Sequence, residues 1–162
     1  MMSARSALEF LCEKYRSRIF ASDAIDWAVA ELTEGNDSVS LRRLAATLKP
    51  TDWWEVEPLL QAAFAELGYP WLAEADCYWA CAEATARDIV AGHVDPSEGC
   101  AAMYELNVAL HFPREFIVWS RWEILLDSRE SENCLDKAPQ ELAALIKSDA
   151  AAWLRTRQRA PE

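Results

Sequence analysis

Residues 86–99 read ARDIVAGHVDPSEG, and this stretch decides the fold. Gly92 follows a run of helix-forming residues and suits the left-handed position that ends an α-helix. Asp95 then stands at an N-cap position and Pro96 at the first helical position, while Glu98 is placed to reach back to the cap. These residues predict that one helix stops and the next begins within a few residues.

Similar signals occur in both directions along the chain. Apolar residues recur at intervals of three and four, as in Leu8, Leu11 and Tyr15, which is typical of one face of a helix. No stretch alternates apolar and polar residues between turn signals, so no strand is expected. We expect helices over about residues 3–20, 23–34, 41–48, 59–67, 72–91, 96–112, 114–127 and 136–157.

Caps and breakers set these boundaries. Ser22, Ser38 or Ser40, and Thr51 are the expected N-caps of the earlier helices. Pro58 lies too far inside its segment for a first turn, so a break is expected there. Residues 128–133 form a polar connector, and Gly99 is expected to allow a close approach between two helices.

Length and composition favour one all-α domain. A chain of 162 residues fits a single domain, and only four glycines accompany abundant alanine, leucine, glutamate and arginine. Because the connectors are short, neighbouring helices should pack as antiparallel pairs. We expect residues 1–162 to form a single compact bundle of about seven or eight mostly antiparallel helices, with a short flexible C-terminal tail from about residue 158.

The net charge of −11 bears on which partners the protein can bind. A negative field repels phosphate backbones, so no nucleic acid is expected, whereas basic proteins are attracted. The N-terminus does not read as a signal peptide, and no stretch approaches the roughly 20 apolar residues of a membrane span. The five cysteines show no paired framework. Buried thiols in a reducing compartment explain them, which predicts a cytoplasmic protein without membrane contact.

The sequence carries no catalytic or metal-binding motif. A Gly-x-Ser-x-Gly elbow is missing, and the two histidines, His93 and His111, lie at predicted helix ends. Cys77 and Cys81 are four residues apart on one helix, but nothing in the spacing selects two further zinc ligands. Packing on an alanine-rich face explains both thiols, so no enzyme activity, cofactor or metal is expected.

One segment departs from a mixed surface. Between Lys49 and Arg87 there are seven carboxylates, four of the eight tryptophans, and no lysine or arginine. Trp53 and Trp54 are adjacent, so a helix cannot direct both to one core and at least one should be partly exposed. Exposed tryptophan beside carboxylates is typical of a surface that binds a basic protein. The candidate partner-binding residues are Asp52, Trp53, Trp54, Glu55, Glu57, Trp71, Glu74 and Asp76. Ordinary core aromatics with a solvated acidic face would explain the same pattern.

Four stretches carry a resemblance to known proteins. They read SLRRLA at 40–45, EVEPLL at 55–60, AELG at 65–68 and ARDIVAGHVDPSEG at 86–99. In this order they resemble small, uncharacterised bacterial proteins that are all-helical, over roughly residues 38–125. The chain is also similar in type to bacterial immunity proteins, which are small, acidic, cytoplasmic and non-enzymatic. The resemblance implies a helical fold and no particular functional residue.

Three functions remain open at this point. The leading hypothesis is a non-enzymatic protein-binding module, such as an immunity protein that neutralises a bacterial toxin by covering a basic surface. The second is a small-molecule-binding or carboxylate-based enzyme domain, which predicts inward-facing pairs such as Glu74 with Asp76 or Asp88. The third is a structural subunit of a larger complex, which predicts a large exposed apolar patch.

Overall fold

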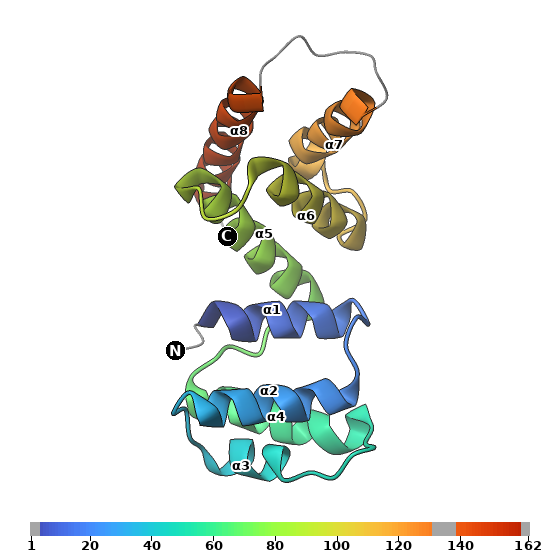
Figure 1. Ribbon diagram of the computed structural model, residues 1–162, viewed down its shortest axis with the longest axis vertical. Helices are drawn as coiled ribbons and strands as arrows, with labels where there is room; N and C mark the ends of the chain where they lie inside the picture. Colours follow the sequence, from blue (N-terminus) through green and yellow to red (C-terminus); the bar gives the residue numbers. More distant parts are fainter. Residues whose placement is uncertain (1–3, 131–138, 160–162) are drawn as a thin grey trace. The chain divides into compact units, whose positions relative to one another are not determined.

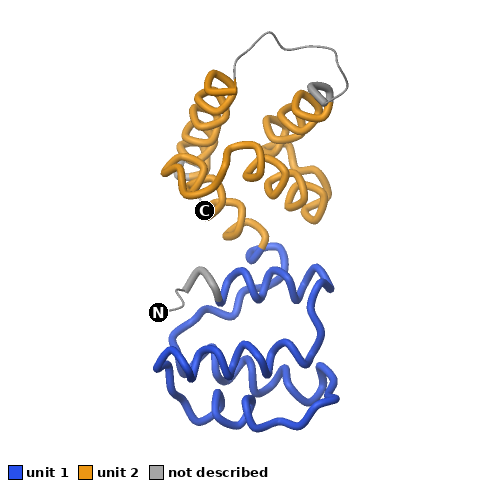
Figure 2. The backbone as a smooth tube through the Cα atoms, in the orientation of Figure 1, with its two compact units in different colours: residues 1–77 blue, residues 78–162 orange. Residues whose placement is uncertain are grey.

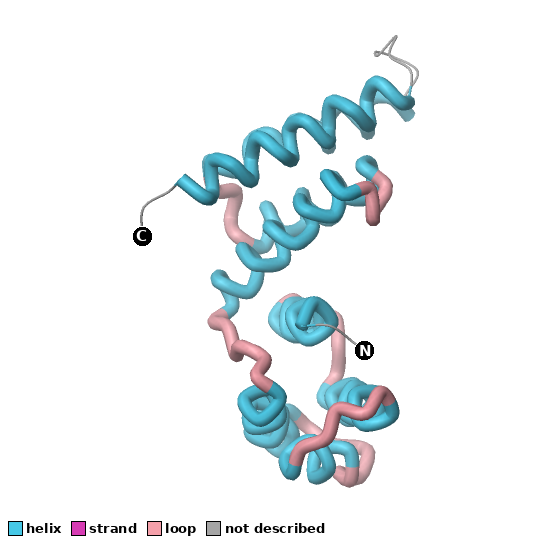
Figure 3. Tube along the Cα trace, turned by 90° about the vertical axis from the view of Figure 1, so that its left-hand side faces the viewer, coloured by secondary structure: helices cyan, strands magenta, loops and turns pink. Residues whose placement is uncertain are grey.

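A computed structural model describes residues 4–130 and 139–159 of the chain. These residues form eight α-helices and one short 3₁₀-helix, and no strand occurs among them. Figure 3 shows helices joined by short loops throughout this part of the chain. The predicted all-α class is therefore confirmed. No helix in these ranges combines the length and the apolar character that crossing a membrane requires.

The chain divides into two compact units, coloured separately in Figure 2. Unit 1 comprises residues 1–77 and unit 2 residues 78–162. The boundary falls inside helix α5, Glu74–Ala91, so this helix begins in unit 1 and continues into unit 2. The expectation of a single domain stays a prediction.

Unit 1 holds four complete helices around an aromatic and aliphatic core. Helix α3 packs against both α2 and α4, and α2 also contacts α4 (Figure 1). Trp27 and Phe64 meet at 5.2 Å between ring centroids and are buried with Leu11, Leu41 and Leu60. The helices are α1 Ala4–Tyr15, α2 Ala21–Thr33, α3 Val39–Ala45 and α4 Trp53–Leu67.

Two of the expected N-caps in unit 1 are wrong. Helix α2 begins one residue before Ser22, and the Asp23 carboxylate accepts a hydrogen bond from the Phe20 N–H at 2.6 Å. Helix α4 is capped by Asp52 and not by Thr51. A carboxylate one residue along the chain competes for the same backbone donors, and its charge interacts more favourably with the helix dipole than a hydroxyl does.

The choice between Ser38 and Ser40 is settled by a contact with α4. Ser38 caps α3 and accepts from the Leu41 N–H at 3.2 Å. Ser40 instead donates its N–H and hydroxyl to the Glu66 carboxylate, at 2.9 and 2.7 Å. Hydrogen bonds from Ser38 and Ser40 hold the pKa of Glu66 below its usual value. The pair therefore ties α3 to α4.

The break expected at Pro58 does not occur. Helix α4 runs without interruption from Trp53 to Leu67 with Pro58 inside it. Pro58 is exposed and lies in the second turn, where it removes the hydrogen bond to the Trp54 carbonyl and no other. Solvent can satisfy an exposed carbonyl, so the buried face of Val56, Leu60 and Phe64 decides that the helix continues.

Unit 2 contains the helix end and the helix start predicted within residues 86–99. Gly92 has a φ of +77° after the end of α5, and Asp95 caps the next helix by accepting from the N–H of Ser97 at 2.8 Å. Both predictions are confirmed. The remaining elements are α6 Pro96–Ala109, the 3₁₀-helix η1 Arg114–Phe116, α7 Ile117–Glu130 and α8 Pro139–Arg159.

Several predicted ends shift by a few residues. Helix α1 stops at Tyr15 because Ser17 adopts a φ of +53°, and α3 stops at Ala45, before the expected stop at Lys49-Pro50. Helix α7 extends to Glu130, into the predicted connector 128–133. The rest of that connector and the predicted start of the last helix lie outside the described residues. The expected tail from 158 is helical as far as Arg159.

Candidate functional site

Trp53 and Trp54 open helix α4 and point in different directions. Successive helical side chains are rotated by about 100°, so neighbours cannot share one face. Trp54 is 92% exposed, whereas Trp53 is half-buried. The prediction that at least one of the pair is exposed is therefore confirmed.

A surface hollow of about 320 Å³ lies beside the two tryptophans. It is lined by Trp53, Trp54, Glu57, Pro58 and Gln61, all from α4, and we refer to it as the α4 hollow. One glutamate and one glutamine supply its polar atoms, and the tryptophans and the proline supply its apolar wall. The α4 hollow can therefore accept a side chain that is both cationic and partly apolar.

Lys14 is the feature of this region that the sequence did not reveal. Its ammonium lies 2.9 Å from the Glu57 Oε1 atom and 5.0 Å from the ring centroids of both Tyr15 and Trp53. The Trp71 ring lies 5.7 Å away. The Lys14 side chain is only 13% exposed. Three aromatic faces and one carboxylate thus enclose one cation, which is the arrangement that aromatic cages for ammonium groups use.

Three of the predicted partner-binding residues contact Lys14 in this cage. Trp53, Glu57 and Trp71 are brought together, but around a lysine of the same chain. Trp71 also packs edge-on against buried Phe64 at 5.3 Å, so it belongs partly to the core. The segment between Lys49 and Arg87 has no lysine or arginine of its own, but the fold places Lys14 of α1 beside it.

Asp52 and Glu55 remain on the exposed side of α4. Asp52 accepts from the Glu55 N–H at 3.1 Å, which caps the helix, and the Glu55 carboxylate accepts from the Thr51 hydroxyl at 2.9 Å. Both carboxylates are exposed at the helix terminus that carries Trp54. They supply the negative field that a basic partner would meet.

Glu74 and Asp76 do not line the α4 hollow. Both are exposed in the first turn of α5, where carboxylates suit the helix dipole. Burial raises the pKa of Tyr15, and the nearby acidic groups of Cys77, Glu57 and Glu74 raise it further. Glu74 therefore acts on Tyr15 of α1.

The carboxylate pairs predicted by the enzyme hypothesis are not formed. Glu74 and Asp76 are both exposed. Asp88 is buried, but it lies about 21 Å along α5 from Glu74 at 1.5 Å per residue. Its Oδ1 atom lies 3.2 Å from Nδ1 of His93, just beyond the helix end. Asp88 and Glu74 therefore do not form the predicted pair.

Glu31 is a buried carboxylate that no motif in the sequence singles out. It accepts from the Asn36 side-chain amide at 2.6 Å and from the Tyr69 hydroxyl at 3.3 Å. Burial raises the pKa of Tyr69, and the charge of Glu31 adds to the rise. Because Glu31 is fully buried, a substrate has no access to it, and the network links α2 to the loop after α4.

Unit 2 has a second hollow of about 630 Å³. It is lined by Tyr104, Phe112, Ser120, Glu123, Ile124 and Asp127. Phe112 is exposed and adopts a φ of +58°, an unusual conformation for a residue with a bulky side chain. Its lining combines the apolar side chains of Phe112 and Ile124 with the carboxylates of Glu123 and Asp127, so it is not the large apolar patch that the structural-subunit hypothesis predicts.

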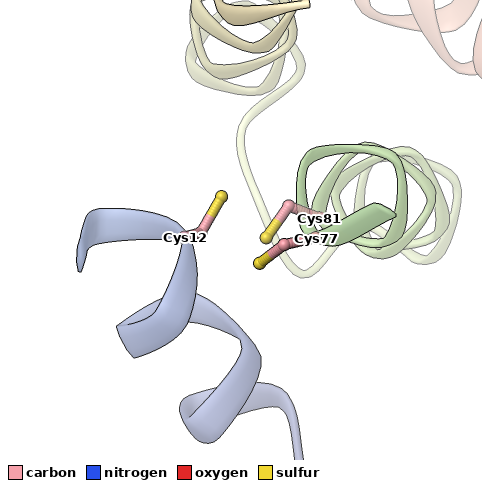
Figure 4. Close-up of side chains that lie close together, drawn as sticks. All are labelled: Cys12, Cys77 and Cys81. Atoms are coloured by element: carbon pink, nitrogen blue, oxygen red, sulfur yellow. The ribbon is translucent and has the colours of Figure 1, made fainter. Parts of the chain in front are cut away.

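Two buried cysteines of unit 1 lie close together. The sulfur atoms of Cys12 and Cys77 lie within 4.8 Å of each other (Figure 4). Cys100 is separate, and burial raises the pKa of its thiol to about 12, which makes it a poor nucleophile.

No protein-family model matches the chain, and no curated protein or solved structure is significantly similar to it. A function for this chain therefore has to be inferred from the geometry of the α4 hollow and its surroundings in unit 1.

Proposed function

We propose that this chain is a non-enzymatic protein-binding module that docks a basic partner on the α4 hollow and the exposed Trp54. The observation that carries the proposal is the 92% exposure of Trp54 beside the carboxylates of Asp52 and Glu55. Burying an exposed indole gives a partner a large apolar gain, and tryptophan is enriched among residues that dominate binding energy. The carboxylates would steer a cationic surface to this position.

The Lys14 cage supports the chemistry of this proposal. Trp53 and Glu57 line the α4 hollow and also contact the Lys14 ammonium. The same two side chains thus already stabilise one cation on their inner side. A lysine or arginine from a partner would meet comparable groups from the solvent side.

More specifically, we propose that the chain is an immunity protein that covers a basic surface of a bacterial toxin. Inhibition of that kind needs complementary charge and an anchoring side chain and no catalytic group. A cytoplasmic location is proposed with it. Support comes from Cys12, Cys77, Cys81 and Cys100, which are buried thiols, as a reducing compartment would keep them.

The proposal is tested with an array of peptides that carry lysine or arginine beside an aromatic residue. Binding of the best peptide should fall by about 30-fold in Trp54→Ala, since a hot-spot tryptophan contributes roughly 2 kcal/mol or more. Leu48→Ala is the matched control, because Leu48 is an 84% exposed apolar residue of the same unit. If Trp54→Ala binds as tightly as the parent, the assigned surface is wrong.

Charge is tested separately by Glu55→Lys, measured at low and high salt. The association rate should fall about tenfold at low salt, and the difference should shrink as salt screens the field. Glu141→Lys is the control, because Glu141 also lies in the first turn of an α-helix and is exposed. Equal effects of both substitutions would show that only net charge matters.

A further inference from the structure

The hollow of unit 2 forms where α6 packs against α7 (Figure 1). Tyr104 of α6, Phe112 of the segment between the helices, and four side chains of α7 line it. The four are Ser120, Glu123, Ile124 and Asp127, and we refer to this site as the α6–α7 hollow. Its volume of about 630 Å³ falls within the roughly 300–1,000 Å³ of small-molecule sites.

The acidic groups of this hollow are two carboxylates on one helix. Glu123 and Asp127 are four residues apart on α7, so they lie on the same face, with Cβ atoms roughly 5–6 Å apart. No lysine or arginine belongs to the lining. Within the part of the chain that the structure describes, neither carboxylate forms an ion pair or a hydrogen bond. The two carboxylates are therefore available to a cationic ligand.

Asn107 gives an independent indication that the hollow takes a hydrogen-bond donor. Its side chain is 1% exposed, and its Nδ2 atom donates to the Ser120 Oγ atom at 2.8 Å. The Oδ1 atom of the same amide is buried and has no hydrogen-bond partner among the described residues. A buried acceptor without a donor costs free energy. Because the amide reaches the lining at Ser120, a ligand N–H group bound there would supply the missing donor.

Phe112 is held at the rim in an unfavourable backbone conformation. Its φ is +58° and its side chain is 60% exposed, so burial of the ring does little to offset the strain. Its N–H donates to the Asn107 carbonyl at 2.9 Å, so Asn107 fixes both Phe112 and Ser120. Glycine would fit this conformation without steric cost. Strained residues of this kind cluster at ligand-binding sites, and a role for the ring in binding explains the phenylalanine.

We propose that the α6–α7 hollow binds a small aliphatic diamine. Two ammonium groups match the carboxylates of Glu123 and Asp127 in number, and charge-assisted hydrogen bonds are the strong ones. The methylene stem packs on Phe112 and Ile124, and aromatic rings such as that of Tyr104 attract ammonium groups. A hard metal ion such as Ca²⁺ takes six or more oxygen ligands, which the apolar side of the hollow does not supply. Binding forms and breaks no covalent bond.

The test titrates the full chain with putrescine by isothermal titration calorimetry at low salt. n-Butylamine, which has the same four-carbon stem and one ammonium group, should bind at least tenfold more weakly. Glu123→Gln and Asp127→Asn should each weaken putrescine binding about tenfold, because each removes a charged acceptor. Glu115→Gln is the control, since Glu115 is exposed and does not line the hollow.

Three results of this titration would overturn the proposal. The first is no binding by the parent chain at about 1 mM putrescine. The second is an equal loss of affinity in Glu115→Gln, which would show that only net charge matters. The third is tighter binding of n-butylamine, phenethylamine or calcium than of putrescine, which would assign the hollow to another class of ligand.

Two glycine variants separate the ring of Phe112 from its backbone strain. Phe112→Gly fits the positive φ, so the melting temperature should not fall, while putrescine affinity should fall about fivefold with loss of the ring. His111→Gly is the matched control, because His111 has a φ of +59° and lies outside the lining. Its affinity for putrescine should equal that of the parent. Unchanged affinity in folded Phe112→Gly, or equal losses in both variants, would contradict the site.

Discussion

Lys14 shows how a single residue can change the character of a surface. It places a positive charge beside residues 50–86, a segment whose own charged side chains are all carboxylates. The Lys14 ammonium is held there by Glu57 and three aromatic rings. Each cation–π contact contributes roughly 0.5–2 kcal/mol when partly desolvated. The lysine therefore joins α1 to α4 and to the segment that leads into α5.

The stability of the cage is tested by Lys14→Met, which keeps the apolar stem and removes the charge. We expect the free energy of unfolding to fall by about 2 kcal/mol, because the ion pair and the ring contacts are lost together. Lys49→Met is the control. Lys49 also pairs with a carboxylate, Asp26 at 2.6 Å, but in solvent, where such a pair contributes about 0–1 kcal/mol. Urea denaturation of both variants measures the difference, and equal losses would show that the cage adds nothing to an ordinary ion pair.

At the scale of elements, the crossing of α5 and α6 depends on Gly99. A Cβ atom at this position would lie 2.5 Å from Cγ1 and 2.7 Å from Cδ1 of buried Ile89. The sequence predicts a close helix approach at Gly99, and the structure confirms it. A β-branched side chain in a packed core has little freedom to move away.

Gly99→Ala should therefore destabilise the protein despite the better helix propensity of alanine. Overpacking costs about 1–3 kcal/mol against a propensity gain of about 1 kcal/mol, so a net loss of about 1 kcal/mol is expected. In an Ile89→Ala background the clash is absent, and the same substitution should become neutral or stabilising. The double-mutant cycle, measured by urea denaturation, has to show this reversal of sign. Additive effects would mean that α6 moves away without cost.

The helices were predictable where their signals are local. Gly92, Asp95 and Pro96 act on backbone groups within one turn, so their sequence order is sufficient to place a boundary. The break predicted at Pro58 is wrong because the apolar face of α4 outweighs one lost hydrogen bond, and that face packs against helices α2 and α3, which are distant in sequence. Local rules therefore located most boundaries and failed where tertiary packing decides.

At the scale of the whole molecule, the candidate sites were only partly predictable. The exposure of Trp54 followed from two adjacent tryptophans on one helix. The Lys14 cage and the approach of the Cys12 sulfur to the Cys77 sulfur could not be predicted, since both need α1 to pack against segments roughly 40 to 65 residues later. Such pairings are set by the tertiary fold, and no spacing within one sequence window encodes them.

The two units share helix α5, and this determines how the molecule should unfold. Unfolding unit 1 would release the first turn of α5 and expose Cys77, while the next residue, Tyr78, is buried and belongs to unit 2. A helix loses cooperativity when it is interrupted, so melting of one end weakens the other. We expect a single transition in urea, with tryptophan fluorescence and circular dichroism coincident. Lys14→Met in unit 1 and Gly99→Ala in unit 2 should each move the whole transition to lower urea. Two separate transitions, each moved by one substitution alone, would show that the units unfold independently and that the prediction of a single domain is wrong.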